Sequence, residues 1–161
     1  MAVDTDEVFM ATKLSGPATF FLPFNKGHGQ SEGNPPNPNG HKTAYLWEEV
    51  FQPASLAGII QHFVLLEGKA ADPLAKKSLI FPRYQQLDVV RRLLDHASTN
   101  GVGHSYLIQH SAGSGKSNSI TWAAYQLIVR LRRGPSDFGC DPMISPTLYQ
   151  RPWMVTPGGF P

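Results

Sequence analysis

Hydrophobic positions in the second half of the chain recur at helical spacing, which predicts two long amphipathic helices. The first spans 83–98, and Asn100-Gly101 follows it as a stop signal. Its apolar stripe consists of Leu87, Val90, Leu93 and Leu94. The second helix follows Lys116, and its stripe consists of Ile120, Ala123, Ala124, Leu127, Ile128 and Leu131. We expect both helices to bury these stripes.

The first half of the chain carries shorter patterns. Residues 7–12 and 18–24 are rich in aromatic residues and Thr, and Gly16-Pro17 separates them. They are expected to form two strands of a hairpin or a sheet edge. A long polar loop follows at 25–42, and loops of this length usually serve a function or mark a boundary.

Two more helices are expected after this loop. One covers 43–51, with Thr43 as a candidate N-cap. The other covers 55–66 and starts at Ser55, a favourable N-cap residue. Its apolar face consists of Leu56, Ile59, Ile60, Phe63 and Val64.

A glycine-rich loop separates a strand-like run at 105–110 from the helix after Lys116. Its sequence is Gly113-Ser114-Gly115-Lys116-Ser117. The order of strand, loop and helix is the context of a P-loop, which binds nucleotide phosphates. The pattern G-x-x-x-x-G-K-[ST] is incomplete, because His110 takes the place of its first glycine, and we interpret His110 as a structural strand-end residue. A chance Gly-Ser turn would not explain the flanking elements.

The residue types in this loop suit ATP and Mg²⁺. Gly113 and Gly115 allow the backbone to curl so that its N–H groups approach the phosphates closely. The following helix N-terminus carries partial positive charge that favours anions. Lys116 is expected to reach the β- and γ-phosphates, and Ser117 to ligate Mg²⁺.

A second candidate motif precedes the loop, in the sequence Phe81-Pro82-Arg83-Tyr84-Gln85-Gln86. An aromatic residue, an Arg and a Gln before a helix resemble the adenine-reading Q motif of superfamily 2 helicases. A Gln amide both donates and accepts, so Gln86 can pair with the N6 and N7 edge of adenine, while Phe81 stacks on the base. The alternative is a plain helix start with exposed glutamines.

Two acidic motifs are rejected as catalytic. Asp6-Glu7-Val8-Phe9 resembles the acidic box of such motors, but it precedes the P-loop instead of following it, so we expect a solvated strand end. Glu67-Gly68-Lys69 resembles part of a nuclease site, but it falls at the end of a helical pattern with no suitably placed earlier Asp. The histidines do not cluster at metal-ligand spacing.

Composition excludes several classes of protein. Apolar residues make up 41% and charged residues 16%, which is too apolar for a disordered chain, and the net charge of +2 lacks the basic stripe of a DNA-binding domain. One cysteine, Cys140, excludes a disulfide framework. Without a signal pattern or an apolar run near the roughly 20 residues of a membrane span, we expect a cytoplasmic protein with no membrane partner.

Several blocks resemble the restriction (R, HsdR) subunit of type I restriction enzymes, from about residue 3 to residue 130. The blocks are Val3-Asp4-Thr5-Asp6, Phe21-Leu22-Pro23-Phe24-Asn25, Gly33-Asn34-Pro35-Pro36-Asn37-Pro38-Asn39-Gly40, Thr43-Ala44-Tyr45-Leu46-Trp47-Glu48, Arg83-Tyr84-Gln85-Gln86-Leu87-Asp88 and Leu107-Ile108-Gln109-His110-Ser111-Ala112-Gly113-Ser114-Gly115-Lys116-Ser117-Asn118-Ser119-Ile120. That family has a nuclease domain, two RecA-like motor domains and a helical region. It assembles with methylation and specificity subunits, pumps DNA with ATP and cleaves it.

The resemblance implies an α/β chain with part of a RecA-like P-loop domain, preceded by the end of a nuclease domain and a helical linker. The implied segments are 1–42 for the nuclease end and loop, 43–80 for the linker, 81–133 for the start of the motor domain and 134–161 for an irregular tail. The tail holds six prolines and matches no strand of the family, as a truncated or frame-shifted end would. The catalytic acids of the nuclease and the acidic box would lie outside this chain, so an ATP-binding fragment is expected. The alternative is a stand-alone, non-catalytic nucleotide-binding or subunit-docking module.

Overall fold

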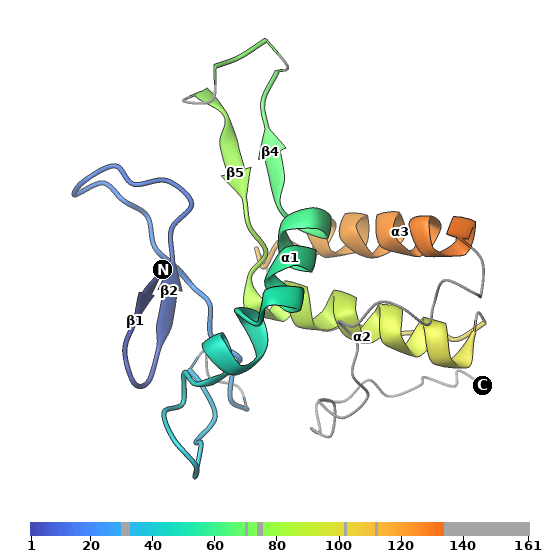
Figure 1. Ribbon diagram of the computed structural model, residues 1–161, viewed down its shortest axis with the longest axis horizontal. Helices are drawn as coiled ribbons and strands as arrows, with labels where there is room; N and C mark the ends of the chain where they lie inside the picture. The colour runs from blue at the N-terminus through green and yellow to red at the C-terminus, as the bar shows by residue number, and fades with distance from the viewer. Residues whose placement is uncertain (30–32, 70, 74–75, 102, 112, 134–161) are drawn as a thin grey trace. The chain divides into compact units, whose positions relative to one another are not determined.

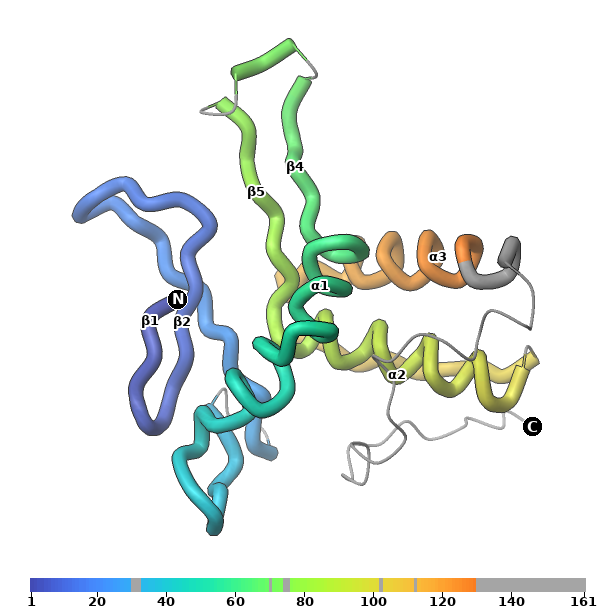
Figure 2. The backbone as a smooth tube through the Cα atoms, viewed as in Figure 1, coloured from blue at the N-terminus to red at the C-terminus, as the bar shows by residue number. Residues whose placement is uncertain are grey.

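The chain folds into two compact units, Met1–Leu87 and Asp88–Pro161. The computed structural model describes residues 1–29, 33–69, 71–73, 76–101, 103–111 and 113–133, so the predicted tail at 134–161 lies outside the described residues. Helices and small antiparallel sheets both occur (Figures 1 and 2), which makes the chain a mixed α and β protein. The predicted RecA-like domain and segment boundaries stay predictions.

The N-terminal unit opens with a three-stranded antiparallel sheet. Its strands are β1 (Ala2–Val3), β2 (Val8–Met10) and β3 (Leu22–Pro23), in the order β1-β2-β3. Phe9 of β2 lies opposite Ala2 on one side and Pro23 on the other. The expected pairing of 7–12 with 18–24 is confirmed, although β3 is short. Pro23 fits because β3 is an edge strand, where a missing N–H costs little.

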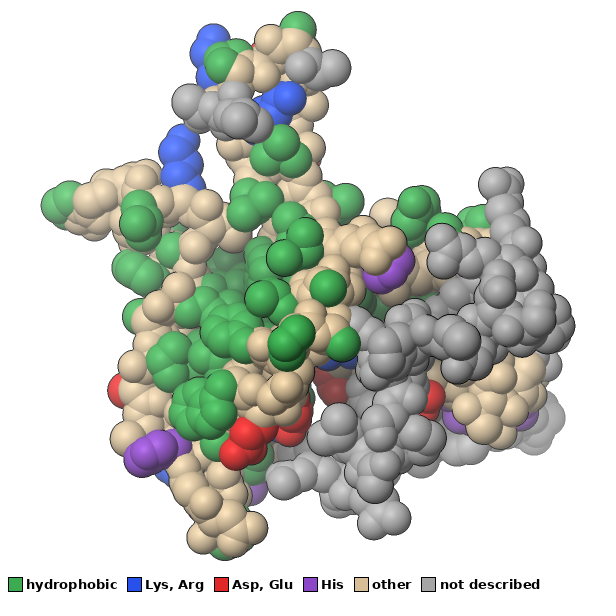
Figure 3. Space-filling view, in the orientation of Figure 1, with side chains coloured by type: hydrophobic (Ala, Val, Ile, Leu, Met, Phe, Trp, Pro, Cys, Tyr) green, Lys and Arg blue, Asp and Glu red, His purple; other side chains and the backbone are tan. Residues whose placement is uncertain are grey.

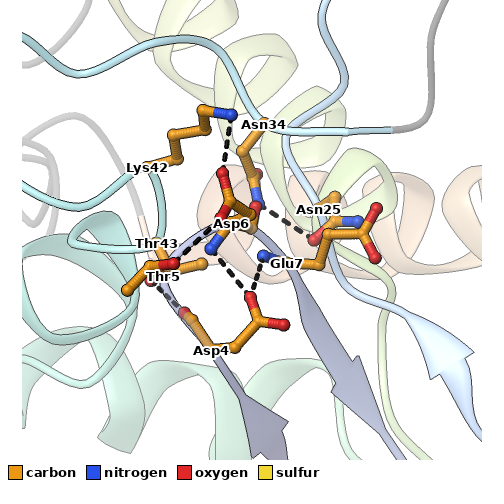
Figure 4. A network of polar contacts seen from close by, with 8 residues as sticks. All are labelled: Asp4, Thr5, Asp6, Glu7, Asn25, Asn34, Lys42 and Thr43. Carbon is orange, nitrogen blue, oxygen red and sulfur yellow. Dashed lines mark hydrogen bonds and ion pairs between the residues drawn. The ribbon is translucent and has the colours of Figure 1, made fainter.

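Asparagine side chains attach the long polar loop to this sheet (Figure 4). Asn25 accepts the backbone N–H of Val8 through Oδ1 at 2.8 Å. Asn34 donates from Nδ2 to that same Oδ1 at 3.0 Å and to the carbonyl of Asp6 at 2.9 Å. Its Oδ1 accepts the N–H of Lys26 at 2.8 Å. Both asparagines are buried, so their polar atoms need hydrogen-bond partners. Their side-chain bonds join the loop to the sheet in the way that backbone hydrogen bonds join strands.

The turn between β1 and β2 is solvated, as expected for Asp6-Glu7. Asp4 accepts the N–H groups of Asp6 and Glu7 through Oδ1, both at 2.7 Å. The Asp6 carboxylate pairs with Lys42 at 2.6 Å, and this hydrogen bond holds the pKa of Asp6 below its ordinary value. The carboxylate is therefore engaged in an ion pair with the loop.

Two helices of the N-terminal unit begin elsewhere than expected. A π-helical turn, η1, covers Leu46–Val50, and Thr43 does not cap it, because its hydroxyl donates to the carbonyl of Asp4 at 2.7 Å. Helix α1 covers Pro53–His62, two residues ahead of the predicted Ser55 start. Pro53 explains the difference, since proline is favoured in the first turn of a helix, where its missing N–H has no partner to lose.

Helix α1 also ends early, and a hairpin follows instead of the predicted continuation to residue 66. Strand β4 (Leu65–Glu67) pairs antiparallel with β5 (Ser78–Ile80). Gly68 has a φ of 150°, and a Cβ there would lie 2.8 Å from Cγ of Lys77, so only glycine fits this turn. The segment expected as a helical linker thus contains a hairpin, and Glu67 lies on a strand.

The hairpin exposes both apolar and basic side chains. Leu65, Leu66 and Leu79 are exposed, and no helix covers them within the described part of the N-terminal unit. Figure 3 shows Lys and Arg side chains gathered at the outer end of the hairpin, where the sequence has Lys69, Lys76 and Lys77.

The core of the N-terminal unit joins the sheet to α1 and to the start of the next helix. Helix α2 covers Tyr84–Asn100 and confirms the helix predicted at 83–98. The most buried side chains of this unit are Val8, Phe24, Thr43, Val50, Ile59, Pro82 and Leu87. Residues from distant parts of the sequence therefore share one core.

The C-terminal unit holds the rest of α2 and helix α3 (Lys116–Arg133), which confirms the helix predicted after Lys116. Helix α2 buries Val90 and Leu94, as its stripe predicts. Over residues 116–129, where its side chains are described, helix α3 does not bury the predicted stripe, because Ile120, Ala124 and Ile128 are exposed and only Ala123 is buried there. The buried side chains of that stretch are Ser119, Trp122, Ala123 and Gln126. The large indole of Trp122 offers more apolar area than any residue of the stripe, which explains this choice of face.

The run at 105–110 does not form the predicted strand. No strand is present in the described stretches 103–111 and 113–133, so the exposed face of α3 has no sheet to cover it there. None of the helices in the described ranges is long and apolar enough to cross a membrane.

Candidate nucleotide-binding site

The glycine loop leads directly into helix α3. Gly113 and Gly115 have φ angles of 72° and 77°, in the left-handed region that glycine adopts without strain. The carbonyl of Gly115 accepts the N–H groups of Asn118 at 3.0 Å and Ser119 at 3.4 Å. These are the first hydrogen bonds of the helix, so the N–H groups of Lys116 and Ser117 precede them and have no helical acceptor.

The side chains expected to bind ATP and Mg²⁺ face solvent. Lys116 and Ser117 are both exposed, and the Ser114 and Gly115 positions are half-buried. An ammonium group, a hydroxyl and the first N–H groups of a helix therefore stand at one end of α3. This donor set fits a chain of phosphates with a bound Mg²⁺ ion, because it offers N–H donors, one positive charge and one oxygen ligand.

A substitution at Gly113 can measure the free-energy cost of the left-handed backbone conformation in this loop. A Cβ added at Gly113 meets nothing within 4 Å, so substitution changes only the backbone energy. Because an L-residue in the left-handed region costs roughly 1–2 kcal/mol, Gly113→Ala should lower the free energy of unfolding by about 1 kcal/mol in urea denaturation. Gly33→Ala is the control, since it also meets nothing within 4 Å and its φ lies outside that region. Equal losses from both substitutions would contradict this account of the loop.

His110 lies close to this loop in sequence, and the charge of Lys116 in the loop affects its pKa. Burial is the main cause that lowers the pKa of the His110 imidazole below its ordinary value, and the positive charge of Lys116 lowers it further. The imidazole is therefore neutral at pH 7, which agrees with a structural role for His110.

This coupling predicts a change that NMR can measure. In Lys116→Ala the repulsive charge is gone, so the pKa of His110 should rise, while staying below its ordinary value because burial is the larger cause. The check is a pH titration of the imidazole Cε1–H signals in both proteins. The other histidines serve as internal controls, and an unchanged His110 titration would show that Lys116 does not act on it.

The Q-like residues lie at the start of α2, in the N-terminal unit. Gln86 is buried, with 4% of its surface exposed, and its Oε1 accepts the N–H of Arg83 at 2.9 Å. The bond runs from the N-cap position to the third helical residue, as in one half of a capping box. This bond is that of a plain helix start, as the alternative expects. The exposure that the alternative expects is wrong for Gln86. It is correct for the exposed Gln85, whose Nε2 donates to the carbonyl of Asn25 at 3.0 Å.

An aromatic cluster surrounds this helix start. The ring of Phe81 lies 6.2 Å from that of Phe24, and the ring of Tyr84 meets Phe24 and Tyr45 edge to face at 5.9 and 5.1 Å. Tyr45 donates its hydroxyl to the carbonyl of Phe24 at 2.6 Å, and burial raises the pKa of Tyr45. Phe81 thus packs against Phe24 within the N-terminal unit.

Sequence reasoning missed the charged pair beside this cluster. Nζ of Lys26 lies 2.6 Å from Oε1 of Glu49 and 4.7 Å from the centre of the Tyr45 ring. Lys26 is 19 positions from Tyr45 and 23 from Glu49, and no periodic pattern connects it to them, so only the fold brings it to them.

The candidate residues fall into two groups that belong to different units. Phe81, Arg83 and Gln86 belong to the N-terminal unit, and the loop at 113–117 belongs to the C-terminal unit. In the first group the N–H of Arg83 bonds to Gln86, and in the second the five residues are consecutive. Among the residues that the structure describes, no three His, Cys, Asp or Glu side chains form a metal-binding group.

Comparisons of this chain with protein-family models, with curated proteins and with solved structures found no match. The resemblance to restriction subunits stays a prediction that rests on the sequence blocks.

Proposed function

We propose that this chain binds ATP and Mg²⁺ through the loop at 113–117, as the ATP-binding portion of a type I restriction R subunit. One observation carries the proposal: Gly113 and Gly115 both adopt left-handed conformations directly before a helix that starts at Lys116. This is the backbone arrangement in which successive N–H groups form a concave anion site.

Each residue of the loop has a role in the proposal. The N–H groups at the start of α3 hold phosphate oxygens, and Lys116 neutralises the β- and γ-phosphates. The hydroxyl of Ser117 ligates Mg²⁺, and Gln86, with Phe81 and Arg83 beside it, reads the adenine. Mg²⁺ supplies charge neutralisation between the phosphates when it is bound.

Binding without efficient hydrolysis is the expected activity. Residues 117–133 contain no Asp or Glu, and Asp6 is paired with Lys42 in the N-terminal unit. A P-loop without a carboxylate to position metal and water hydrolyses ATP poorly. DNA translocation, DNA cleavage, the methylation and specificity subunits as partners, and a cytoplasmic location belong to the intact enzyme in this proposal.

Equilibrium dialysis with radiolabelled ATP, with and without Mg²⁺, tests the proposal, and phosphate release with and without DNA is measured beside it. We expect Mg²⁺-dependent binding and little phosphate release. Failure to bind ATP at millimolar concentration, or rapid DNA-stimulated hydrolysis, would contradict it.

A non-catalytic docking module is the second candidate, and one observation favours it. Ile120, Tyr125 and Ile128 on α3 are 67%, 60% and 52% exposed. An exposed apolar strip on a helix is typical of a surface that meets another protein. ATP binding that DNA leaves unchanged, together with association with other restriction subunits, would favour this candidate.

A further inference from the structure

After helix α2 ends, the chain reverses and brings two ring side chains back to this helix. Gly101 and Gly103 have φ angles of 76° and 104°, in the left-handed region, which allows a tight reversal. The hydroxyl oxygen of Tyr106 then lies 2.8 Å from Nδ1 of His96, ten residues earlier on α2. The imidazole ring of His104 lies 5.1 Å from that of His96, centre to centre. All three side chains belong to the C-terminal unit.

The spacing of the two imidazole rings suits two ligands of one metal ion. A tetrahedral Zn²⁺ ion binds imidazole nitrogens at about 2.0–2.1 Å, which places the centres of two bound rings about 5 Å apart. The rings of His96 and His104 are perpendicular, at 87°, and a ligand ring can take any twist about its bond to the metal. His104 is exposed, so its ring can turn toward an ion without displacing packed side chains.

The hydrogen bond between His96 and Tyr106 is a second, independent observation, and a pair of imidazoles packed without a metal has no need of it. When the proton is on Nδ1, this N–H donates to the Tyr106 oxygen, and Nε2 keeps its lone pair. A histidine that binds a metal usually donates its other ring N–H to such an oxygen, which fixes the tautomer and the direction of the ring. Metal binding would therefore select this tautomer of His96.

We propose that His96 and His104 bind a divalent transition-metal ion, with Zn²⁺ as the best geometric match, and that Tyr106 orients His96 for it. Imidazole nitrogen is a preferred ligand of such ions. Within the described stretches no third His, Cys, Asp or Glu joins these two histidines, so water molecules complete the coordination. The ion would fasten the segment ahead of the glycine loop to α2, and it should stabilise the folded chain.

Calorimetric titration with ZnCl₂ tests this in the full 161-residue chain, without a histidine tag and without nucleotide. We expect one bound ion per chain and an affinity that His104→Ala lowers by at least tenfold, because a ligand is lost. His104 is exposed, so the substitution should leave the fold intact, which circular dichroism checks. Zn²⁺ should also raise the melting temperature of the unmodified chain and should raise that of His104→Ala much less.

Two further variants make the result specific. Tyr106→Phe keeps the ring and removes only the hydroxyl that bonds to His96. It should weaken Zn²⁺ binding by about tenfold, since losing an outer partner of a ligand typically costs 10–100-fold in metal affinity. His41→Ala removes an exposed histidine of the N-terminal unit and should leave the affinity unchanged.

Three results would overturn the site. They are no Zn²⁺ binding at millimolar concentration, equal binding by His104→Ala and the unmodified chain, and an equal loss in His41→Ala. Unchanged affinity in Tyr106→Phe would overturn the orienting role of Tyr106. The experiment contains no nucleotide, so its failure leaves the proposed ATP site standing, and a failure to bind ATP leaves this metal site standing.

Discussion

Replacing Lys116 with alanine is expected to weaken ATP binding by about a hundredfold, because hydrogen bonds to charged groups contribute roughly 1.5–3 kcal/mol each. Lys116 is exposed at the first position of α3, so the substitution removes no packing. Alanine is also the best helix former, which keeps the helix start intact. The expected loss is therefore one of binding and leaves folding unchanged.

The measurement compares ATP and tripolyphosphate binding to Lys116→Ala and to Lys69→Ala. Lys69 is also exposed, on the hairpin of the N-terminal unit, and its substitution changes the net charge equally. We expect Lys69→Ala to bind both ligands like the unmodified chain. A similar loss in both variants would show that net charge, and no specific loop, attracts the phosphates.

The largest effect on stability is expected from Phe24→Ala, which should lower the free energy of unfolding by about 3–5 kcal/mol. Phe24 is fully buried, and its ring meets those of Phe81 and Tyr84. Its backbone N–H also donates to the carbonyl of Val8 at 2.8 Å, so a shift of residue 24 would disturb the sheet. A loss of this size is a large part of the stability of a small protein.

Urea denaturation followed by circular dichroism measures this loss, and Phe20→Ala is the matched control. Phe20 lies four residues earlier and is 76% exposed, so its removal should change the free energy of unfolding by less than about 0.5 kcal/mol. Comparable losses at both positions would show that Phe24 is not a core residue.

The helical spacing of apolar residues was enough to predict the two long helices, α2 and α3. The stripe at Leu87, Val90 and Leu94 and the stop at Asn100-Gly101 predicted α2, and the structure confirms them. For α3 the predicted helix is confirmed, but the face that was predicted to be buried is wrong. A sequence pattern shows which side of a helix is apolar, but the available partners decide which side is buried.

Helix limits depended on signals that compete with one another. Ser55 is a good N-cap residue, yet Pro53 starts α1 two residues earlier. Residues 63–66 continue a helical spacing of apolar side chains, yet Gly68 permits a tight turn that brings β4 and β5 together. Short apolar runs fit a strand as well as a helix, so spacing could not decide between them.

The two halves of the candidate site differed in how much the sequence revealed. The left-handed angles at Gly113 and Gly115 follow from a local motif, because only glycine adopts them easily. The surroundings of Gln86 depend on Phe24, Tyr45 and Glu49, which are 37 to 62 positions away. Such contacts arise from tertiary folding and leave no short-range pattern.

The asparagine network of the polar loop limits which related sequences can share this fold. Asn34 donates from its amide and accepts through its oxygen, so neither aspartate nor serine could replace all its bonds. Asn25 accepts both of these bonds through its oxygen, and an aspartate oxygen could accept them as well. In any set of relatives that keep this loop, position 34 should therefore vary less than position 25, although neither residue belongs to the proposed ATP site.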